Sequence, residues 1–189
     1  MQHVAARNLE IKVACGADGL ADIRARLEAE GVAVAERLRQ IDTYFAVPNG
    51  RLKLREIADL DEVDGAEAKL IGYVRPDTES SRWSTYHVAT IAPSEAPALL
   101  ASLDVTIGTR VRVAKRRDIA LWDATRVHLD EVERLGAFVE LETVIAEQSE
   151  DDAMREHERI VLALGLDRWA PISGSYSDLL LNLGNDEPA

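Results

Sequence analysis

The chain has little of several features that mark common classes of protein. Cys15 is the only cysteine among 189 residues, so no intramolecular disulfide can form, and we expect a reducing, cytoplasmic environment. No apolar run approaches the length that crosses a membrane, and the first ten residues lack an apolar signal core, so we expect no membrane partner. These absences predict an ordinary soluble protein that folds as a single domain over residues 1–189.

Positive charge is scarce compared with negative charge. Lys and Arg together number 22 against 34 Asp and Glu, which gives a formal net charge of -12 at pH 7. Because such a chain repels polyanions over most of its surface, we expect no nucleic-acid partner held by bulk electrostatics. A small anion bound in a local basic pocket is still compatible with this charge.

Strands with one apolar and one charged face are abundant. In Arg7–Ala14, for example, Leu9 and Ile11 alternate with Glu10 and Lys12. The predicted strands are Arg7–Ala14, Val32–Val47, Arg51–Ile57, Ala68–Arg75, Arg82–Ile91, Thr109–Trp122, Arg126–Val132 and Ala137–Ile145. Apolar residues at helical spacing predict helices at Gly19–Glu30, Pro93–Leu103 and Glu150–Leu164, and Ser175–Leu181 is a short apolar segment expected to dock onto the body.

Two carboxylates lie two residues apart in one of these strands. Glu140 and Glu142 share a face, which places them roughly 6–7 Å apart. Like charges that close repel each other unless a cation lies between them, and Mg²⁺ and Mn²⁺ take carboxylate ligands. A metal site and a solvated outer strand face are both compatible with this pair.

Cations gather in the same way on two other strands. Arg51, Lys53 and Arg55 project from one face of their strand, as an anion site requires. In Thr109–Trp122, Lys115 and Arg117 share one face, while the other face carries Arg110, Arg112 and Arg116. Parity alone does not say which of the two sets faces an anion.

Strands of this kind do not suit a two-sheet sandwich with one dry core. A closed barrel can enclose charged faces around water or a ligand, while helices cover its apolar outside. We therefore predict a mainly-β α+β fold, in which eight antiparallel strands form a closed β-barrel tunnel with helices packed outside.

Several segments together resemble the CYTH superfamily, the triphosphate tunnel metalloenzymes, which include class IV adenylyl cyclases and thiamine triphosphatases. The resemblance covers nearly the whole chain in the expected order. It rests on RNLEIK (Arg7–Lys12), QIDTYF (Gln40–Phe45), LKLRE (Leu52–Glu56), LIGYVRPD (Leu70–Asp77), KRR (Lys115–Arg117), RVHLDEVERLGAFVELE (Arg126–Glu142) and SYSDLL (Ser175–Leu180).

The resemblance implies a tunnel that binds a triphosphate with Mg²⁺ or Mn²⁺. The implied metal ligands are Glu10, Asp130, Glu140 and Glu142, and the implied substrate-binding cations are Lys53, Arg55, Arg75, Arg82, Lys115 and Arg117. From their chemistry, Lys12 and Asp130 are the candidate catalytic residues, with a metal-bound hydroxide and His128 as alternative bases. The family signature Glu-x-Glu-x-Lys departs at its first position, where Asn8 brings an amide oxygen but no charge.

The resemblance also implies the reaction, with three alternatives. The first is a class IV adenylyl cyclase, which converts ATP to cyclic AMP and pyrophosphate and is favoured by the LDEV and SYSDLL segments. The second is an inorganic or organic triphosphatase of the thiamine type. The third is a tunnel that binds a nucleotide or polyphosphate without turnover. The implied partner is a small-molecule triphosphate, ATP or another, and the resemblance also favours a homodimer.

Overall fold

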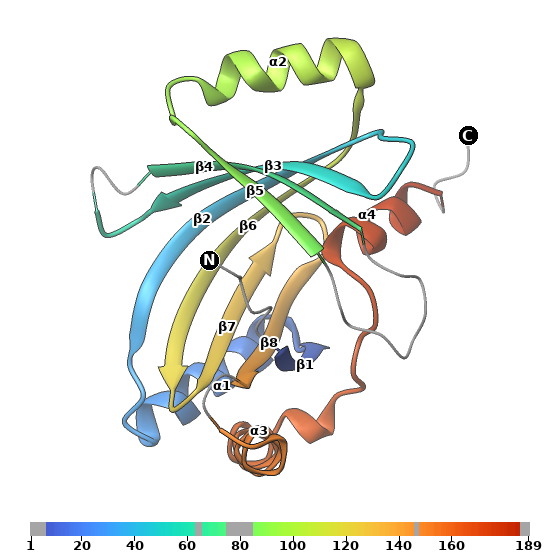
Figure 1. Cartoon of the computed structure of the whole chain (residues 1–189). Helices are drawn as coiled ribbons and strands as arrows, with labels where there is room; N and C mark the ends of the chain where they lie inside the picture. Colours follow the sequence, from blue (N-terminus) through green and yellow to red (C-terminus); the bar gives the residue numbers. More distant parts are fainter. Residues whose placement is uncertain (1–6, 63–65, 75–84, 146–147, 186–189) are drawn as a thin grey trace. The chain divides into compact units, whose positions relative to one another are not determined.

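A computed structural model describes residues 7–62, 66–74, 85–145 and 148–185 (Figure 1). In chain order, its elements are β1 (Arg7–Ala14), α1 (Gly16–Ala29), β2 (Val34–Phe45), β3 (Arg51–Asp59), β4 (Ala66–Val74), β5 (Thr85–Ile91), α2 (Ala96–Ile107), β6 (Thr109–Trp122), β7 (Thr125–Val132), β8 (Gly136–Ile145), α3 (Glu150–Leu164), the short 3₁₀ helix η1 (Leu166–Arg168) and α4 (Tyr176–Asn185). None of the described helices is both long enough and apolar enough to cross a membrane.

The eight described strands form one hydrogen-bonded sheet in the order β1-β8-β7-β6-β2-β3-β4-β5. The pairings of β1 with β8, β7 with β8, β2 with β3, β3 with β4 and β4 with β5 are all antiparallel. The predicted mainly-β fold with eight antiparallel strands is therefore confirmed. The predicted closure is not, because β1 and β5 end the strand order and no hydrogen-bonded ladder joins them in the described part of the chain.

The chain divides into two compact units, which we call unit 1 and unit 2. Unit 1 contains Met1–Arg37 and Arg116–Gly174, and unit 2 contains Leu38–Lys115 and Ser175–Ala189. The long strands β2 and β6 contribute residues to both units.

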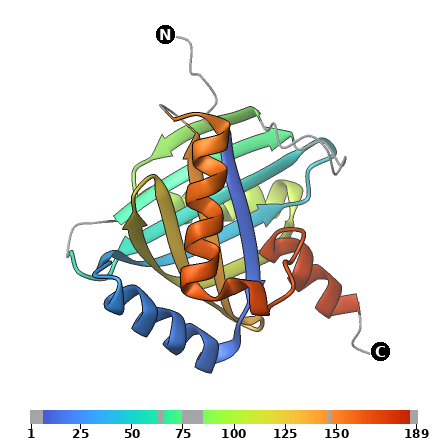
Figure 2. The ribbon, with the colours of Figure 1, turned by 90° about the horizontal axis from the view of Figure 1, so that it is seen from below.

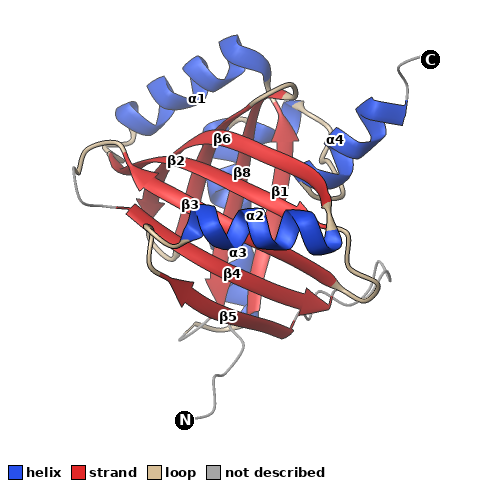
Figure 3. Ribbon diagram, turned by 90° about the horizontal axis from the view of Figure 1, so that it is seen from above, coloured by secondary structure: helices blue, strands red, loops and turns tan. Residues whose placement is uncertain are grey.

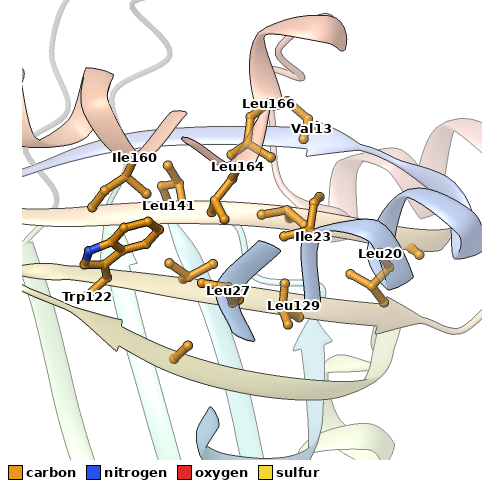
Figure 4. Packing of buried hydrophobic residues seen from close by; sticks show 14 residues of the cluster. Val13, Leu20, Ile23, Leu27, Trp122, Leu129, Leu141, Ile160, Leu164 and Leu166 are labelled. Atoms are coloured by element: carbon orange, nitrogen blue, oxygen red, sulfur yellow. The ribbon is translucent and has the colours of Figure 1, made fainter. Parts of the chain in front are cut away.

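The core of unit 1 lies between its strands and the helices α1 and α3. Leu20, Ile23 and Leu27 recur at helical spacing on α1, and each is at most 4% exposed. Ile160 and Leu164 also lie at helical spacing on α3, and both are 0% exposed. The helix α3 lies across the strands in Figure 2. Figure 4 shows these side chains gathered with strand residues such as Val13, Leu129 and Leu141.

A polar network also ties α3 to the strands of unit 1. The buried hydroxyl of Thr125 lies 2.8 Å from that of Thr143 and donates to Glu156 Oε1 at 2.6 Å. The Thr143 hydroxyl in turn lies 2.9 Å from His157 Nδ1. Because buried hydroxyls are costly without partners, this network fixes the register of α3 on β7 and β8.

The core of unit 2 lies under α2, which covers β3 and β4 in Figure 3. Phe45, Leu54 and Ala68 from three strands meet Ala96 there, and each is at most 3% exposed. The alternation in β3 therefore buries Leu54 under the helix and leaves Lys53 and Arg55 on the opposite face of the strand.

Several helix boundaries differ from the predicted ones. The helix α1 begins at Gly16 rather than Gly19, so Asp18 lies in its first turn and does not cap it. The helix α2 begins at Ala96 after Glu95, three residues beyond the predicted start. The span of α3 is as predicted: Ser149 caps it by accepting a hydrogen bond from the Asp152 amide.

Candidate functional site

Strand register in unit 1 places the charged residues of β1, β8 and β7 in rows. Lys12 lies opposite Glu140, and Glu140 lies opposite His128 on its other side. Residues directly opposite in an antiparallel pair share a face, so these three side chains are neighbours. With Arg117 and Asp130, they form what we call the acid–base cluster.

Arg117 is the centre of the acid–base cluster. Its Nε and Nη2 donate to Asp130 Oδ1 and Oδ2, both at 2.6 Å, and Nη2 also donates to Glu140 Oε2 at 3.0 Å. Lys12 Nζ lies 3.7 Å from Glu140 Oε1 and donates to the Gly174 carbonyl at 3.2 Å. Asp130 is 0% exposed, so its charge depends on the two-point bond from Arg117.

Glu140 is held in its charged form by this cluster. Burial by itself would raise the pKa of its carboxyl group. Neighbouring His128, Lys12 and Arg117 act in the opposite direction and prevail, so its pKa lies far below the ordinary value. A carboxylate that stays charged at every physiological pH can act as an ion ligand or as an acceptor for a fixed cation.

His128 is buried in the same cluster, and one of its ring nitrogens has no hydrogen-bond partner among the described residues. Its Nδ1 lies 3.8 Å from Glu140 Oε2, too far for a hydrogen bond, and it is buried without a hydrogen-bond partner among the described residues. Burial lowers the pKa of His128 below its ordinary value, although the carboxylate of Glu140 opposes the effect. The ring is therefore neutral at neutral pH.

A second row in unit 1 contains Glu10, Glu142 and Arg126, again directly opposite one another. Asn8 Nδ2 donates to Glu142 Oε1, and Arg126 Nη1 donates to Glu142 Oε2 at 3.1 Å. The oxygen of the Asn8 side-chain amide, Oδ1, is buried and has no hydrogen-bond partner among the described residues. A buried oxygen of this kind is costly unless something outside the chain binds to it.

This second row offers the donor chemistry that a hard divalent cation takes. Glu10 and Glu142 supply carboxylates on one face, and the unsatisfied Asn8 Oδ1 is a neutral oxygen ligand on the same face of β1. Both Asp130 and Glu142 accept hydrogen bonds at both oxygens, but Asp130 fits less well because it is 0% exposed, whereas the Glu142 side chain is 20% exposed. In the described part of the chain, no three His, Cys, Asp or Glu side chains converge closely enough to hold a metal by themselves.

Unit 2 carries a cluster in which cations outnumber acids, which we call the cation cluster. Asp42 of β2 accepts from Arg55 Nε at 2.7 Å and Arg55 Nη2 at 2.8 Å. It also accepts from Lys53 Nζ at 2.9 Å and from Gln40 Nε2 at 3.2 Å. The Lys53 ammonium lies 5.3 Å from the centre of the Tyr44 ring. Two cations therefore share one acid.

Burial makes the cation cluster electrostatically strong. Asp42 is only 5% exposed, which by itself would raise its pKa. The hydrogen bond from Arg55 and the charges of Lys53 and Arg55 outweigh burial and hold the pKa well below its ordinary value. Burial also raises the pKa of the Tyr44 hydroxyl, and the charge of Asp42 raises it further.

The two sets of cations on β6 differ in how far they are exposed to solvent. Lys115 is 6% exposed, and its ammonium lies 5.0 Å from the centre of the Tyr176 ring on α4. The side chain of Arg117 is 12% exposed. Arg110, Arg112 and Arg116, by contrast, are exposed. The covered set is thus Lys115 and Arg117, the set that the family resemblance selected.

Arg51 has a different role from its neighbours on β3. Its guanidinium donates to Asp178 at 3.2 Å and to the Ser175 hydroxyl at 3.1 Å. Ser175 and Asp178 also bond to each other at the start of α4, where the Asp178 carboxylate accepts from the Ser175 amide. Arg51 therefore anchors the C-terminal helix.

The structure brings most of the predicted residues into the two clusters or beside them. Lys12, Arg117, Asp130 and Glu140 meet in unit 1, while Lys53 and Arg55 meet in unit 2. The predicted substrate-binding residues Arg75 and Arg82 lie outside the described residues. Sequence reasoning missed Asp42 as a member of the site, although its position across from Arg55 follows from the pairing of β2 with β3.

The fold and the clusters define a class: a mainly-β protein whose strands carry buried groups of mixed charge. The profile of the CYTH domain matches residues 6–168, and the chain belongs to this family. No curated protein matches the chain by sequence.

Solved structures share this fold at low sequence identity. The PH1012 protein from Pyrococcus horikoshii is 20% identical, with a TM-score of 0.69 over 92% of this chain and 99% of that one. A candidate adenylate cyclase from Vibrio parahaemolyticus is 20% identical, with a TM-score of 0.58 over 92% and 97% of the two chains. Another candidate adenylate cyclase, from Bacillus halodurans, is 13% identical, with a TM-score of 0.56 over 89% and 93%.

Proposed function

We propose that this protein is a metal-dependent enzyme that acts on a triphosphate, and that its reaction is that of a class IV adenylyl cyclase. The acid–base cluster carries the proposal, because Arg117 holds two carboxylates in place beside Lys12 on the face of a CYTH sheet. The candidate adenylate cyclases among the structural relatives support the choice of reaction.

The cations of the chain would bind the phosphate oxygens. Phosphoryl chemistry asks a protein chiefly for positioning and for stabilisation of negative charge. Arg55 supplies a guanidinium that Asp42 already orients, and its side chain is 29% exposed. Arginine donors fixed in this way match the spacing of phosphate oxygens.

A divalent cation would be held by the second row of unit 1. We assign Glu10, Glu142 and the Asn8 amide oxygen to it, with Mg²⁺ and Mn²⁺ as the ions that suit oxygen ligands. When bound, such an ion supplies positive charge next to the phosphates. Glu140, which is held by Lys12 and Arg117, would then stabilise the arrangement of the cations beside this row.

Lys12 is the proposed catalytic residue that touches substrate. Its ammonium is held between Glu140 and the Gly174 carbonyl, and its side chain is 13% exposed. Asp130 is fully buried under Arg117, so we assign it the orientation of Arg117 rather than contact with the substrate.

The closed tunnel, the single domain, the cytoplasmic location and the homodimer stay predictions.

Products distinguish the cyclase from its alternatives. The protein would be incubated with ATP, inorganic triphosphate or thiamine triphosphate in Mg²⁺ or Mn²⁺, and followed by phosphorus NMR. Pyrophosphate and a cyclic nucleotide are expected. Release of orthophosphate would identify a triphosphatase instead, and binding without products would identify a non-catalytic tunnel.

A further inference from the structure

The cation cluster of unit 2 already contains an anion of its own. Both oxygens of Asp42 accept hydrogen bonds from Arg55, at 2.7 and 2.8 Å, in the forked geometry in which a guanidinium binds a phosphate. Lys53 adds a third charged donor at 2.9 Å. The carboxylate therefore takes hydrogen bonds that a bound phosphate would also use.

Burial shields most of this cluster from solvent. The side chain of Asp42 is 7% exposed, and that of Lys53 is 9% exposed. The Arg55 side chain is 29% exposed, which makes it the most accessible of the three charged groups. Counted by themselves, Asp42, Lys53 and Arg55 carry a single net positive charge.

We propose that Asp42 is an internal counter-ion that limits the anion affinity of Arg55 and Lys53, so that the cluster holds a phosphate chain loosely enough to release it. This inference rests on the proposed function, because it takes a triphosphate as the ligand. It assigns Asp42 a positioning role: the residue orients Arg55 and sets the charge that the phosphate meets. Its consequence is that affinity follows the net charge of the cluster.

Four forms of the full-length protein test this relation. Asp42→Asn raises the net charge of the cluster by one, Lys53→Gln lowers it by one, and the double variant restores the original value. Isothermal titration with inorganic triphosphate, and separately with pyrophosphate, is carried out in EDTA so that no metal contributes. Each titration is repeated at several salt concentrations, because the number of ionic contacts sets the dependence on salt.

The expected order of affinity is Asp42→Asn first, wild type and the double variant together, and Lys53→Gln last. We expect at least a fivefold gain for Asp42→Asn and a comparable loss for Lys53→Gln, with the steepest salt dependence in Asp42→Asn. Glu158→Gln changes the net charge of the protein by the same amount on the exposed face of α3, and it should bind as wild type does.

Two results would overturn the inference. Weaker or unchanged binding in folded Asp42→Asn would show that the carboxylate supports the ligand or has no influence on it. If Asp42→Asn does not fold, the double variant is compared with Lys53→Gln, and failure to bind more tightly than Lys53→Gln would reject the inference equally. If wild type binds neither anion in EDTA, this inference fails, because it assigns binding to the cations alone. The proposed function is metal-dependent and is tested separately, by the products formed in Mg²⁺ or Mn²⁺. If wild type binds, any failure among the variants concerns the role of Asp42 alone.

Discussion

The two clusters use the same kinds of charged side chain in different proportions. In unit 1, one guanidinium serves two carboxylates, because Arg117 contacts both Asp130 and Glu140. In unit 2, one carboxylate serves two cations, because Asp42 contacts both Arg55 and Lys53. A shared partner keeps the grouped side chains charged and oriented in both cases. With Lys12 included, the acid–base cluster has two cations for two carboxylates, whereas the cation cluster has two cations for one carboxylate.

The largest expected effect on turnover comes from removing the charge of Glu140 in unit 1. Glu140→Gln keeps the size of the side chain and removes the charge that Lys12 and Arg117 contact. We expect metal-dependent turnover to fall by at least about 100-fold, or about 2.7 kcal/mol of transition-state stabilisation. Initial rates with ATP measure this turnover, and circular dichroism checks that the variant is folded. Turnover at the wild-type level would contradict the role of Glu140.

The largest expected effect on stability comes from Asp130 in unit 1. Asp130→Asn leaves Arg117 beside a neutral amide in a buried position, and breaking a buried pair costs about 3–5 kcal/mol. Urea unfolding gives the free energy of unfolding. Asp123→Asn is the matched control, because Asp123 pairs with Arg159 at an exposed position and such pairs contribute at most about 1 kcal/mol. Equal losses of unfolding free energy in the two variants would contradict the expected difference between the buried pair and the exposed pair.

Acid should weaken both clusters, through Glu140 and Asp42. Their ordinary pKa values are 4.5 and 3.8, and the folded protein holds both lower. A carboxyl group with a lowered pKa contributes stability that is complete above its unfolded pKa and is lost as pH falls toward the folded pKa. We expect the free energy of unfolding to fall steadily below about pH 4.5.

The variant Asp42→Asn tests how much of this acid sensitivity comes from unit 2. Asp42→Asn has no carboxyl group to protonate at this position, so its stability should decline less steeply below about pH 4 than that of wild type. Urea unfolding at each pH gives both curves. Parallel curves for Asp42→Asn and wild type would show that Asp42 keeps an ordinary pKa.

The smallest effect concerns Lys115, whose ammonium lies over an aromatic ring. Tyr176→Leu removes the aromatic face 5.0 Å from the Lys115 ammonium, and we expect a loss of about 1 kcal/mol. Tyr176→Phe keeps the ring and should lose less. Thermal unfolding compares the two variants, and equal losses would assign the effect to the hydroxyl group.

Much of this arrangement could be predicted before the structure. Alternation in Arg7–Ala14 and Arg51–Ile57 indicated the strands and the residues that share a face, because side chains of a strand point alternately to its two sides. The pair Glu140 and Glu142 was compatible with a metal site or a solvated strand face, and Glu142 accepts a hydrogen bond from Asn8, whose amide oxygen is unsatisfied among the described residues. The predicted closure of the sheet is not confirmed in the described part of the chain. Alternation within single strands does not determine which distant strands pair.

The sequence by itself determined the strand faces, the acidic pair of β8 and the family. Only the tertiary structure decided that Lys115 and Arg117 are covered while Arg110 and Arg116 are exposed, and that Asp42 lies between Lys53 and Arg55. Periodicity says which residues share a face, but not which face is covered or which side chain lies across from it. Those two properties are set by strand register and by the packing of helices, both of which arise from contacts between residues far apart in the chain.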